Sequence, residues 1–458
     1  MLFLAVVAAL GGYLFGYDTA VISGTISQVT AQFGLTPLQE GWYVGCALVG
    51  SIAGVMTAGV LTDKFGRKNV LILSAVLFGA SSLGCAICSS YEQLVFYRIM
   101  GGVGIGVVSI ASPLYISEVS AAQYRGRLVG LYQLAITIGF LGAYLVNYGL
   151  LWYAEQGASL LSSPLMHQVF YDEIWRGMLG MEVFPALLFL IAAFFIPESP
   201  RWLVLKNKEV VARVILTRIH QSAEIAQVEI DQTKSVLSSQ SESDWSLIKS
   251  PGIRRAILIG CAIAILGQFM GVNAVLYYGP KIFEDSGLSG GDSLFYQVMV
   301  GLANVVATVL AVFIIDRVGR KKLIYYGVSA MIVFLLLIAF YFTQNEKLGL
   351  TPTFMLVCFM GYIFSCAISI SAVIFVLLSE MYPMKIRGIA MSIAGFSLWV
   401  GTYLIGQLTP WLLQPLTPAG TFVFFAVVCI PYMVIIWKWV PETARKSLED
   451  IEQYWLKK

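Results

Sequence analysis

A lone carboxylate lies inside the first apolar stretch of the chain. Asp18 stands in Leu14-Phe-Gly-Tyr-Asp-Thr-Ala-Val-Ile-Ser-Gly24, and between Met1 and Gly24 the only other ionisable residues are tyrosines. An ionised side chain at the centre of a bilayer costs about 2.5–3.5 kcal/mol on insertion scales, so such residues are usually there for a function. The chemistry open to a carboxyl group in this position is the uptake and release of a proton.

Two further ionisable residues are predicted to lie at the depth of Asp18. Asp18 follows Leu2 by a distance of about 24 Å along a helix, toward the outer side of the membrane. Arg98 and Glu182 come a few residues into the fourth and sixth predicted helices, which run inward from that side. Charges on three helices at one level can neutralise one another. The pattern fits a structural ion-pair cluster, or a site where protonation and helix movement depend on each other.

A second group of polar residues consists of uncharged amides in apolar runs. They are Gln133, Gln268, Asn273 and Asn304. Amides both donate and accept hydrogen bonds, as a neutral polyhydroxyl ligand requires, although a single buried amide more often joins two helices. Gln268 and Asn273 are five residues apart, so they share a helix face only loosely unless the helix is interrupted near Gly271.

The composition predicts the helices that must position these residues. The chain is 58% hydrophobic and 12% charged, whereas soluble domains carry about 25% charged residues. Apolar windows of about 18–25 residues predict twelve membrane-spanning helices. They begin near Leu2, Trp42, Val70, Leu94, Val129, Gly177, Arg255, Phe295, Leu323, Phe354, Ile389 and Thr421. No alternating pattern indicates a β-barrel, and no metal cluster, nucleophile–base pair or phosphate-binding glycine loop indicates an enzyme.

Basic residues are distributed unevenly along this pattern. If Met1 lies inside, 25 of the 29 Lys and Arg fall in cytoplasmic segments and helix ends. The positive-inside rule then predicts an even number of spans with both termini in the cytoplasm.

The chain also repeats itself. Three charged motifs of the first half recur in the same order in the second half. The first half contains Asp63 with Arg67, Glu118 with Arg125, and the Glu198 of Pro-Glu-Ser. The second half contains Asp316 with Arg320, Glu380 with Arg387, and the Glu442 of Pro-Glu-Thr. Such repeats in a polytopic chain are typical of transporters built from two bundles, with the binding site at their interface. The ten charged residues can latch the inner faces of the bundles together, or they can anchor and cap helices.

We predict four regions from these patterns. Residues 1–200 form an N-terminal six-helix bundle and residues 253–442 a C-terminal one, while residues 443–458 are a short cytoplasmic tail. Residues 201–252 join the bundles, and the apolar spacing of Glu209–Ile219 indicates amphipathic cytoplasmic helices there.

Several motifs of this chain resemble those of the sugar porters of the major facilitator superfamily. They are the repeated Asp-(Arg/Lys)-x-Gly-Arg-Lys loops, the Pro-Glu-Ser and Pro-Glu-Thr motifs and the segment around Asp18. The resemblance implies an all-α membrane protein with twelve helices in two pseudo-symmetric bundles that rock around a central site. It implies that Asp18 carries a proton under the control of Arg98 and Glu182, and that the inner charges stabilise the outward-open state. It maps the sugar contacts onto Phe15, Gln133, Gln268, Asn273, Tyr278, Asn304, Phe375 and Trp399.

Several positions depart from the family pattern. Gly267, Phe375 and Leu398 stand where relatives carry polar side chains, and Ser371-Ala372 replaces a Gly-Pro pair. The identity of the sugar therefore does not transfer with the resemblance.

We expect a proton-coupled symporter that imports a neutral pentose or hexose, since glucose facilitators of the family have Asn in place of Asp18. A passive facilitator and a non-transporting sugar sensor are the alternatives. We expect no cofactor other than the proton and no nucleic-acid partner. We also expect a monomer in the inner membrane of a bacterium.

Overall fold

The computed structural model describes residues 1–121, 124–156, 163–238, 250–382 and 386–442. Every regular element in these ranges is a helix, and twelve helical segments are long and apolar enough to cross a membrane. The prediction of an all-α, twelve-span membrane protein is therefore confirmed.

The spanning segments of the first half follow the predicted apolar windows. They are α1 (Leu2–Val21) continued by η1 (Ile22–Gly24), α3 (Pro37–Phe65), α4 (Arg67–Ile87), α5 (Tyr91–Glu118), α6 (Arg125–Glu155), and α8 (Ile174–Gly180) with α9 (Val183–Phe195). Short elements stand between them: α2 (Ile26–Phe33), α7 (Pro164–His167) and the π-helix η2 (Gln168–Asp172).

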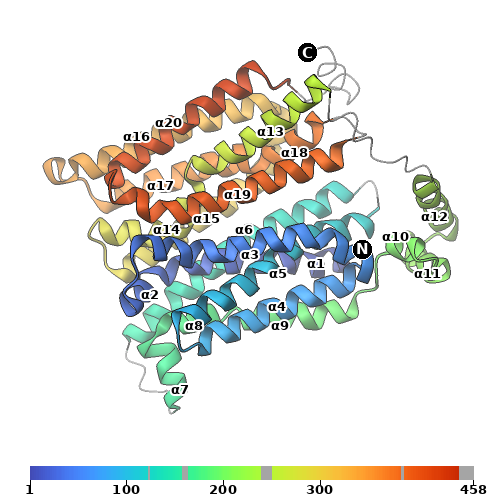
Figure 1. The fold of residues 1–458 in the computed structure, drawn as a ribbon, viewed down its shortest axis with the longest axis horizontal. Coiled ribbons are helices and arrows are strands. Elements are labelled where there is room, and N and C mark those ends of the chain that lie inside the picture. Colours follow the sequence, from blue (N-terminus) through green and yellow to red (C-terminus); the bar gives the residue numbers. More distant parts are fainter. Residues whose placement is uncertain (122–123, 157–162, 239–249, 383–385, 443–458) are drawn as a thin grey trace. The chain divides into compact units, whose positions relative to one another are not determined.

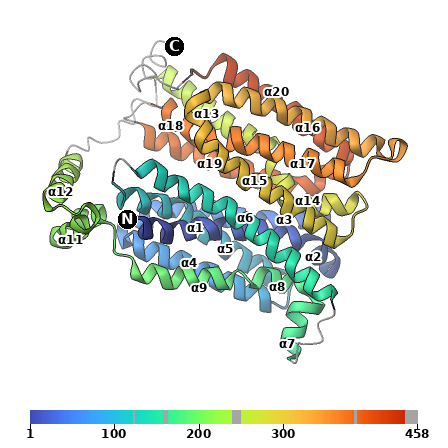
Figure 2. The same cartoon turned by 180° about the vertical axis from the view of Figure 1, so that it is seen from behind.

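The second half repeats this arrangement. Its spanning segments are α13 (Pro251–Phe269) with α14 (Val272–Asp285), α15 (Gly290–Val318), α16 (Arg320–Leu348), α17 (Pro352–Cys366) with the π-helix η4 (Ala367–Ser371) and α18 (Ala372–Met381), α19 (Arg387–Leu413) and α20 (Thr417–Lys438). Figures 1 and 2 show these elements from opposite sides.

The chain forms two compact units. Unit 1 comprises residues 1–28 and 46–242, and unit 2 comprises residues 29–45 and 243–458. The segment 29–45, with most of α2 and the start of α3, thus belongs to unit 2 although the flanking residues belong to unit 1. The predicted domain boundaries after residues 200 and 252 remain predictions.

The repeated Gly-Arg-Lys loops are tight turns between consecutive helices. Gly66, between α3 and α4, has φ +92°, and Gly319, between α15 and α16, has φ +92° as well. This left-handed conformation favours glycine. A Cβ added to Gly66 would also lie 2.2 Å from Oε2 of Glu198, so a larger residue there would displace that carboxylate.

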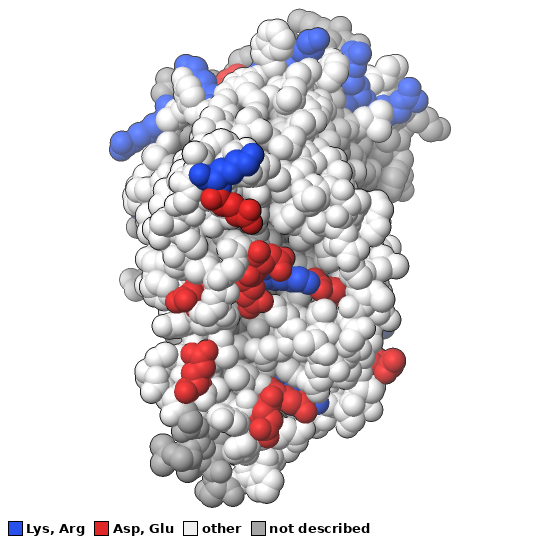
Figure 3. Space-filling view, turned by 90° about the vertical axis from the view of Figure 1, so that its left-hand side faces the viewer, with Lys and Arg blue, Asp and Glu red and all other residues white. Residues whose placement is uncertain are grey.

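Figure 3 shows acidic side chains at several places on the face turned to the viewer. In unit 1 the helix ends and connections around α7 contain Glu92, Asp172 and Glu173. In unit 2 the ends of α14 and α16 and the start of α15 contain Glu284, Asp285, Asp292 and Glu346. The opposite ends of the helices contain the repeated basic loops, so the charge is distributed asymmetrically along the helix axes.

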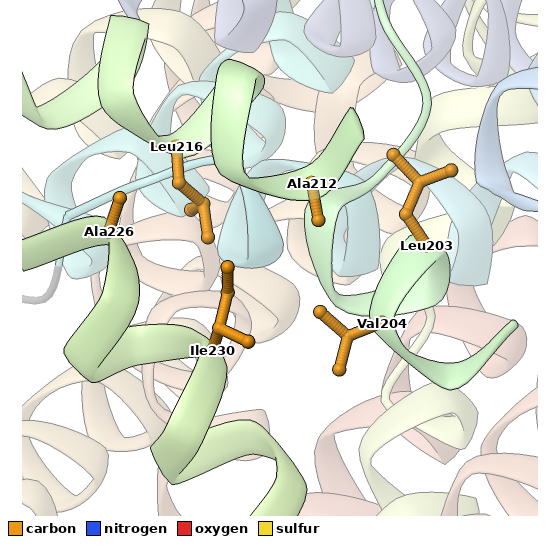
Figure 4. Packing of buried hydrophobic residues seen from close by; sticks show 6 residues of the cluster. All are labelled: Leu203, Val204, Ala212, Leu216, Ala226 and Ile230. Atoms are coloured by element: carbon orange, nitrogen blue, oxygen red, sulfur yellow. The ribbon is translucent and has the colours of Figure 1, made fainter. Parts of the chain in front are cut away.

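Three short helices follow α9 and belong to unit 1: α10 (Pro200–Leu205), α11 (Glu209–His220) and α12 (Ala223–Ser238). They enclose a small apolar cluster, in which Leu203 and Val204 meet Ala212 and Leu216 of α11 and Ala226 and Ile230 of α12 (Figure 4). Two contacts of 2.7 Å, His220–Glu229 and Lys234–Glu209, join α11 to α12. The helix expected from the spacing of Glu209–Ile219 is α11.

Candidate functional site

The three charged residues predicted to share one depth lie together in unit 1. Asp18 is in the last turn of α1, Arg98 is in α5 and Glu182 lies between α8 and α9, and each is only 1–2% exposed. Nη1 of Arg98 donates to Oδ1 of Asp18 and, at 3.3 Å, to the Asp18 backbone carbonyl. Glu182 interacts electrostatically with both. One guanidinium group thus faces two carboxyl groups.

The charges and hydrogen bonds of this cluster would be balanced by one added proton. Oδ2 of Asp18 and Oε1 of Glu182 are buried and accept no hydrogen bond from the described part of the chain. Leaving a buried acceptor without a donor is costly, more so for a charged group. A single proton on either carboxyl supplies a donor and makes the cluster electrically neutral. The chemistry that the geometry supports is therefore binding and release of one proton.

The glycine run that follows Arg98 serves the packing of this site. A Cβ added to Gly102 would lie 1.9 Å from the carbonyl oxygen of Ala47, and one added to Gly106 would lie 2.1 Å from that of Ser51. Gly102 and Gly106 therefore let α5 pack closely against α3, as small residues do at contacts between membrane helices.

The amide pair of unit 2 meets across a break in the seventh span. α13 ends at Phe269, Gly271 adopts φ +93°, and α14 begins at Val272. Because the helix is interrupted, Nδ2 of Asn273 reaches Oε1 of Gln268 at 2.7 Å. Thr402 of α19 donates to the same oxygen at 3.1 Å. Discontinuous helices of this kind form binding sites in transporters.

We expect Gly271→Ala to disrupt this break. Its φ of +93° is costly for alanine, and the new Cβ would lie 2.4 Å from the ring of Phe425. The combined strain is worth about 1–3 kcal/mol, so the apparent affinity for sugar should fall about 5- to 150-fold. Binding to purified protein measures this, with Gly395→Ala as control because a Cβ there meets no atom within 4 Å. Equal affinities of the two variants would contradict the expectation.

The other predicted sugar contacts lie in different surroundings. In unit 1, Phe15 of α1 is half-buried and Gln133 of α6 is exposed. In unit 2, Asn304 of α15 is buried and Trp399 of α19 is half-buried. The two remaining predicted contacts, also in unit 2, differ in exposure. Phe375 of α18 is 51% exposed, whereas Tyr278 of α14 is fully buried. The Tyr278 hydroxyl donates to the carbonyl of Gly406 at 2.6 Å. The Tyr278 hydroxyl is thus already engaged within the protein.

The structure shows what surrounds the positions that depart from the family pattern. A Cβ added to Gly267 would meet Tyr432 at 3.7 Å and Ile370 at 3.9 Å, which are ordinary contacts, so packing does not require glycine there. Leu398 contributes no polar side chain, but one turn later Thr402 supplies a hydroxyl to Gln268. Ser371, which replaces the glycine of the Gly-Pro pair, ends the π-helix η4.

The repeated charged residues of unit 1 are arranged around a buried ion pair. Arg67 donates to Glu118 twice, from Nε at 2.9 Å and from Nη2 at 3.0 Å. Nη1 of Arg67 also donates to Asp63 at 3.3 Å, and Ser199 donates to Glu118. Arg125 donates instead to the carbonyl of Ser117 at 3.0 Å.

Glu198 caps the helix that begins with Arg67. Its Oε1 accepts from the backbone amides of Arg67 at 2.8 Å and Lys68 at 3.1 Å, which satisfies free donors at the start of α4. In unit 2, Glu442 accepts from the backbone amide of Lys321 at 3.1 Å. Both copies of the motif therefore place a carboxylate on a helix N-terminus.

The second ion pair is repeated as well. Arg320 donates to Oε1 of Glu380 at 3.1 Å, as Arg67 does to Glu118. The side chains of Asp316 and Arg387 lie outside the described residues. Helix capping, one of the two interpretations of these charges, is thus present in both units, whereas the latch remains a prediction.

Comparison with known proteins places the chain in a family. The family model described as "Sugar (and other) transporter" matches residues 4–455. The chain belongs to this family of sugar transporters. The arabinose-proton symporter of Bacillus subtilis (strain 168) is 35% identical to this sugar porter, over 98% of this chain and 94% of the relative. The galactose-proton symporter of Escherichia coli (strain K12) is 33% identical, over 99% and 94%.

Solved structures show the same fold for this sugar porter. The inward open conformation of the xylose transporter XylE from E. coli matches with a TM-score of 0.84 at 32% identity, covering 98% of this chain and 99% of that chain. A crystal structure of the D-xylose-proton symporter matches with a TM-score of 0.76 at 32% identity, covering 97% and 99%. The resemblance to the major facilitator superfamily is confirmed.

Three polar side chains of this sugar porter were not anticipated from its sequence. Ser199 and Thr402 are hydroxyls that complete the contacts of Glu118 and Gln268. Glu40, in the first turn of α3, is 2% exposed and pairs with Lys281 of α14. A signal for this last pair was present, because Lys281 is one of the few basic residues outside the segments predicted to be cytoplasmic.

Proposed function

We propose that this sugar porter imports a neutral monosaccharide, a pentose or hexose, together with a proton by alternating access. The observation that carries the proposal is the pair of buried carboxyl oxygens beside Arg98, one on Asp18 and one on Glu182, for which the described residues offer no hydrogen-bond donor. The names of the arabinose-proton and galactose-proton symporters support it.

The mechanism follows from the charge balance of this cluster. With both carboxyls ionised, Asp18 and Glu182 outweigh Arg98 by one negative charge. Uptake of one proton by Asp18 removes this excess and weakens its attraction for the guanidinium group. Protonation then biases the helices α1 and α5 toward a different arrangement, because the two states interact with Arg98 with different strength. A membrane potential contributes about 2.3 kcal/mol per charge per 100 mV to the cycle.

Sugar hydroxyls would be held by the amides and the hydroxyl that the break at Gly271 brings together. Gln268, Asn273 and Thr402 already form a hydrogen-bonded group, whose members can both donate and accept. We assign Gln133 and Asn304 the same role, with Phe15, Phe375 and Trp399 contacting the C–H faces of the sugar. Tyr278 supports α14 from behind, because its hydroxyl bonds to Gly406.

We further propose that in each unit the acidic helix ends face the outside of the cell. The repeated basic loops then lie in the cytoplasm with both termini, as the positive-inside rule requires. The protein acts as a monomer in the inner membrane of a bacterium, and the proton is its only coupling ion.

The proposal is tested in proteoliposomes with an imposed pH gradient. We expect accumulation of labelled sugar that a protonophore abolishes, and competition by unlabelled pentoses, hexoses and cyclitols identifies the substrate. Equilibration without accumulation would contradict coupling and indicate a passive facilitator. Sugar binding without flux would indicate a sensor, and the absence of both would indicate another substrate class.

We expect Gln268→Leu to weaken sugar binding. The substitution removes the shared acceptor of Asn273 and Thr402 along with a predicted sugar contact, so the apparent KM should rise about tenfold. The measurement is the concentration dependence of sugar uptake. Gln414→Leu serves as control, because Gln414 is exposed at the end of α19; an equal KM for both variants would remove Gln268 from the site.

A further inference from the structure

Helix α3 is shared between the two units. It is one continuous helix of 29 residues, Pro37–Phe65, yet its residues up to Gly45 belong to unit 2 and those from Cys46 belong to unit 1. In a cycle that moves the units, the start of α3 has to be released from unit 2 or carried along with it. The contacts that hold this segment therefore bear on the cycle.

The principal polar contact is a largely buried ion pair. Nζ of Lys281 on α14 donates to Oε2 of Glu40 on α3, and the hydroxyl of Thr30 on α2 donates to the same oxygen at 3.1 Å. The Glu40 side chain is 3% exposed and that of Lys281 is 26% exposed. Removing one partner of a buried pair leaves an uncompensated charge, which is strongly unfavourable.

Helix α19 supports the same segment. Nε2 of Gln407 donates to the backbone carbonyl of Leu38 at 2.9 Å. At Gly41 the two backbones come so close that an added Cβ would lie 2.0 Å from the carbonyl oxygen of Gln407. Gln407, which is 8% exposed, is thus covered by the start of α3 and would become accessible if this segment moved away.

Lys281 has a second acid within reach. Asp285 lies one turn later on α14 and interacts electrostatically with both Lys281 and Glu40. Side chains four residues apart on a helix are neighbours. Lys281 can therefore exchange Glu40 for Asp285 without losing an acidic partner, which lowers the barrier to breaking the first pair.

We propose that Glu40 and Lys281 form an outer latch, which holds the start of α3 on unit 2 and opens once in each transport cycle as Lys281 passes to Asp285. The inference rests on the proposed alternating access. It assigns a role to residues that lie outside both the proton cluster and the sugar-binding amides.

Exposure of Gln407 tests the latch without sugar or a pH gradient. In a Gln407→Cys background in right-side-out vesicles, a membrane-impermeant thiol reagent reports how often the start of α3 leaves α19. We expect Lys281→Gln to raise the labelling rate at least about tenfold, because the open state no longer has to break a buried ion pair. The matched control is Lys347→Gln, which removes an exposed lysine of the same side, and the unsubstituted chain gives the background from native cysteines.

Two further variants keep the test decisive if Lys281→Gln does not fold. The double exchange of Glu40→Lys with Lys281→Glu restores an ion pair. It should return the labelling rate to within about threefold of the rate of the Gln407→Cys chain without other substitutions. Asp285→Asn removes the alternative partner and should slow labelling. Labelling of Lys281→Gln at the rate of Lys347→Gln, or faster labelling of Asp285→Asn, overturns the latch. Because the readout involves no transport, a failure of the proposed symport would appear separately, as absent sugar accumulation in a protein whose latch responds as expected.

Discussion

Asp18→Asn is expected to abolish sugar accumulation driven by a pH gradient while exchange of labelled for unlabelled sugar continues. Asparagine has nearly the same shape and can still accept from Arg98, but it cannot take up a proton. Since the proton supplies the driving force, the accumulation ratio should fall to about 1, the value for a passive carrier. Uptake and counterflow in the same proteoliposomes measure the two quantities.

A matched substitution separates this effect from general damage. Asp231→Asn makes the same chemical change on the exposed surface of α12 and should leave both accumulation and counterflow unchanged. If the Asp18 variant still accumulates sugar against a gradient, the proton is carried elsewhere and the assignment of the cluster is wrong.

Arg67→Met is expected to have the second large effect. It would leave Glu118 almost fully buried without its guanidinium partner, and breaking a buried pair in this way costs about 3–5 kcal/mol. We expect a clearly lower midpoint of thermal unfolding and a turnover reduced at least about tenfold, with little change in sugar affinity. Thermal unfolding in detergent and transport in proteoliposomes measure these quantities.

The double variant Arg67→Met with Glu118→Gln tests the physical reason. Because it removes both charges, it should recover part of the lost stability, as expected for two residues that interact directly. Arg213→Met, at an exposed position of α11, is the control. A double variant as unstable as the sum of the single ones would show that the ion pair is not the cause.

The number and order of the spanning helices could be predicted because each apolar window is long enough to be recognised. The second window begins at Trp42, yet α3 begins at Pro37, because helices continue beyond the apolar region that hydropathy detects. The sequence indicated an interruption near Gly271 only as the condition under which Gln268 and Asn273 would share a helix face, and the structure contains this interruption. The π-helix η4 and the break before Val183 had no comparable signal.

The charged part of the site was predictable for a different reason. Ionised residues are rare in apolar helices, so depth along the helices was enough to group Asp18 with Arg98 and Glu182. Hydroxyl residues gave no such signal. Thr402 also donates to the carbonyl of Leu398 in its own helix at 2.9 Å, as threonines in helices commonly do, so its role beside Gln268 is visible only in the fold.

The shared helix α3 has a consequence for biosynthesis. The ribosome adds Glu40 to the chain about 240 residues before Lys281, so the carboxyl group enters the membrane long before its partner exists. The first half therefore cannot reach its final arrangement during synthesis, and residues 29–45 settle only after α14 and α19 have been inserted. A gene cut between the two bundles would yield a C-terminal fragment that lacks residues 29–45 of unit 2, and only co-expression of the N-terminal fragment would supply them.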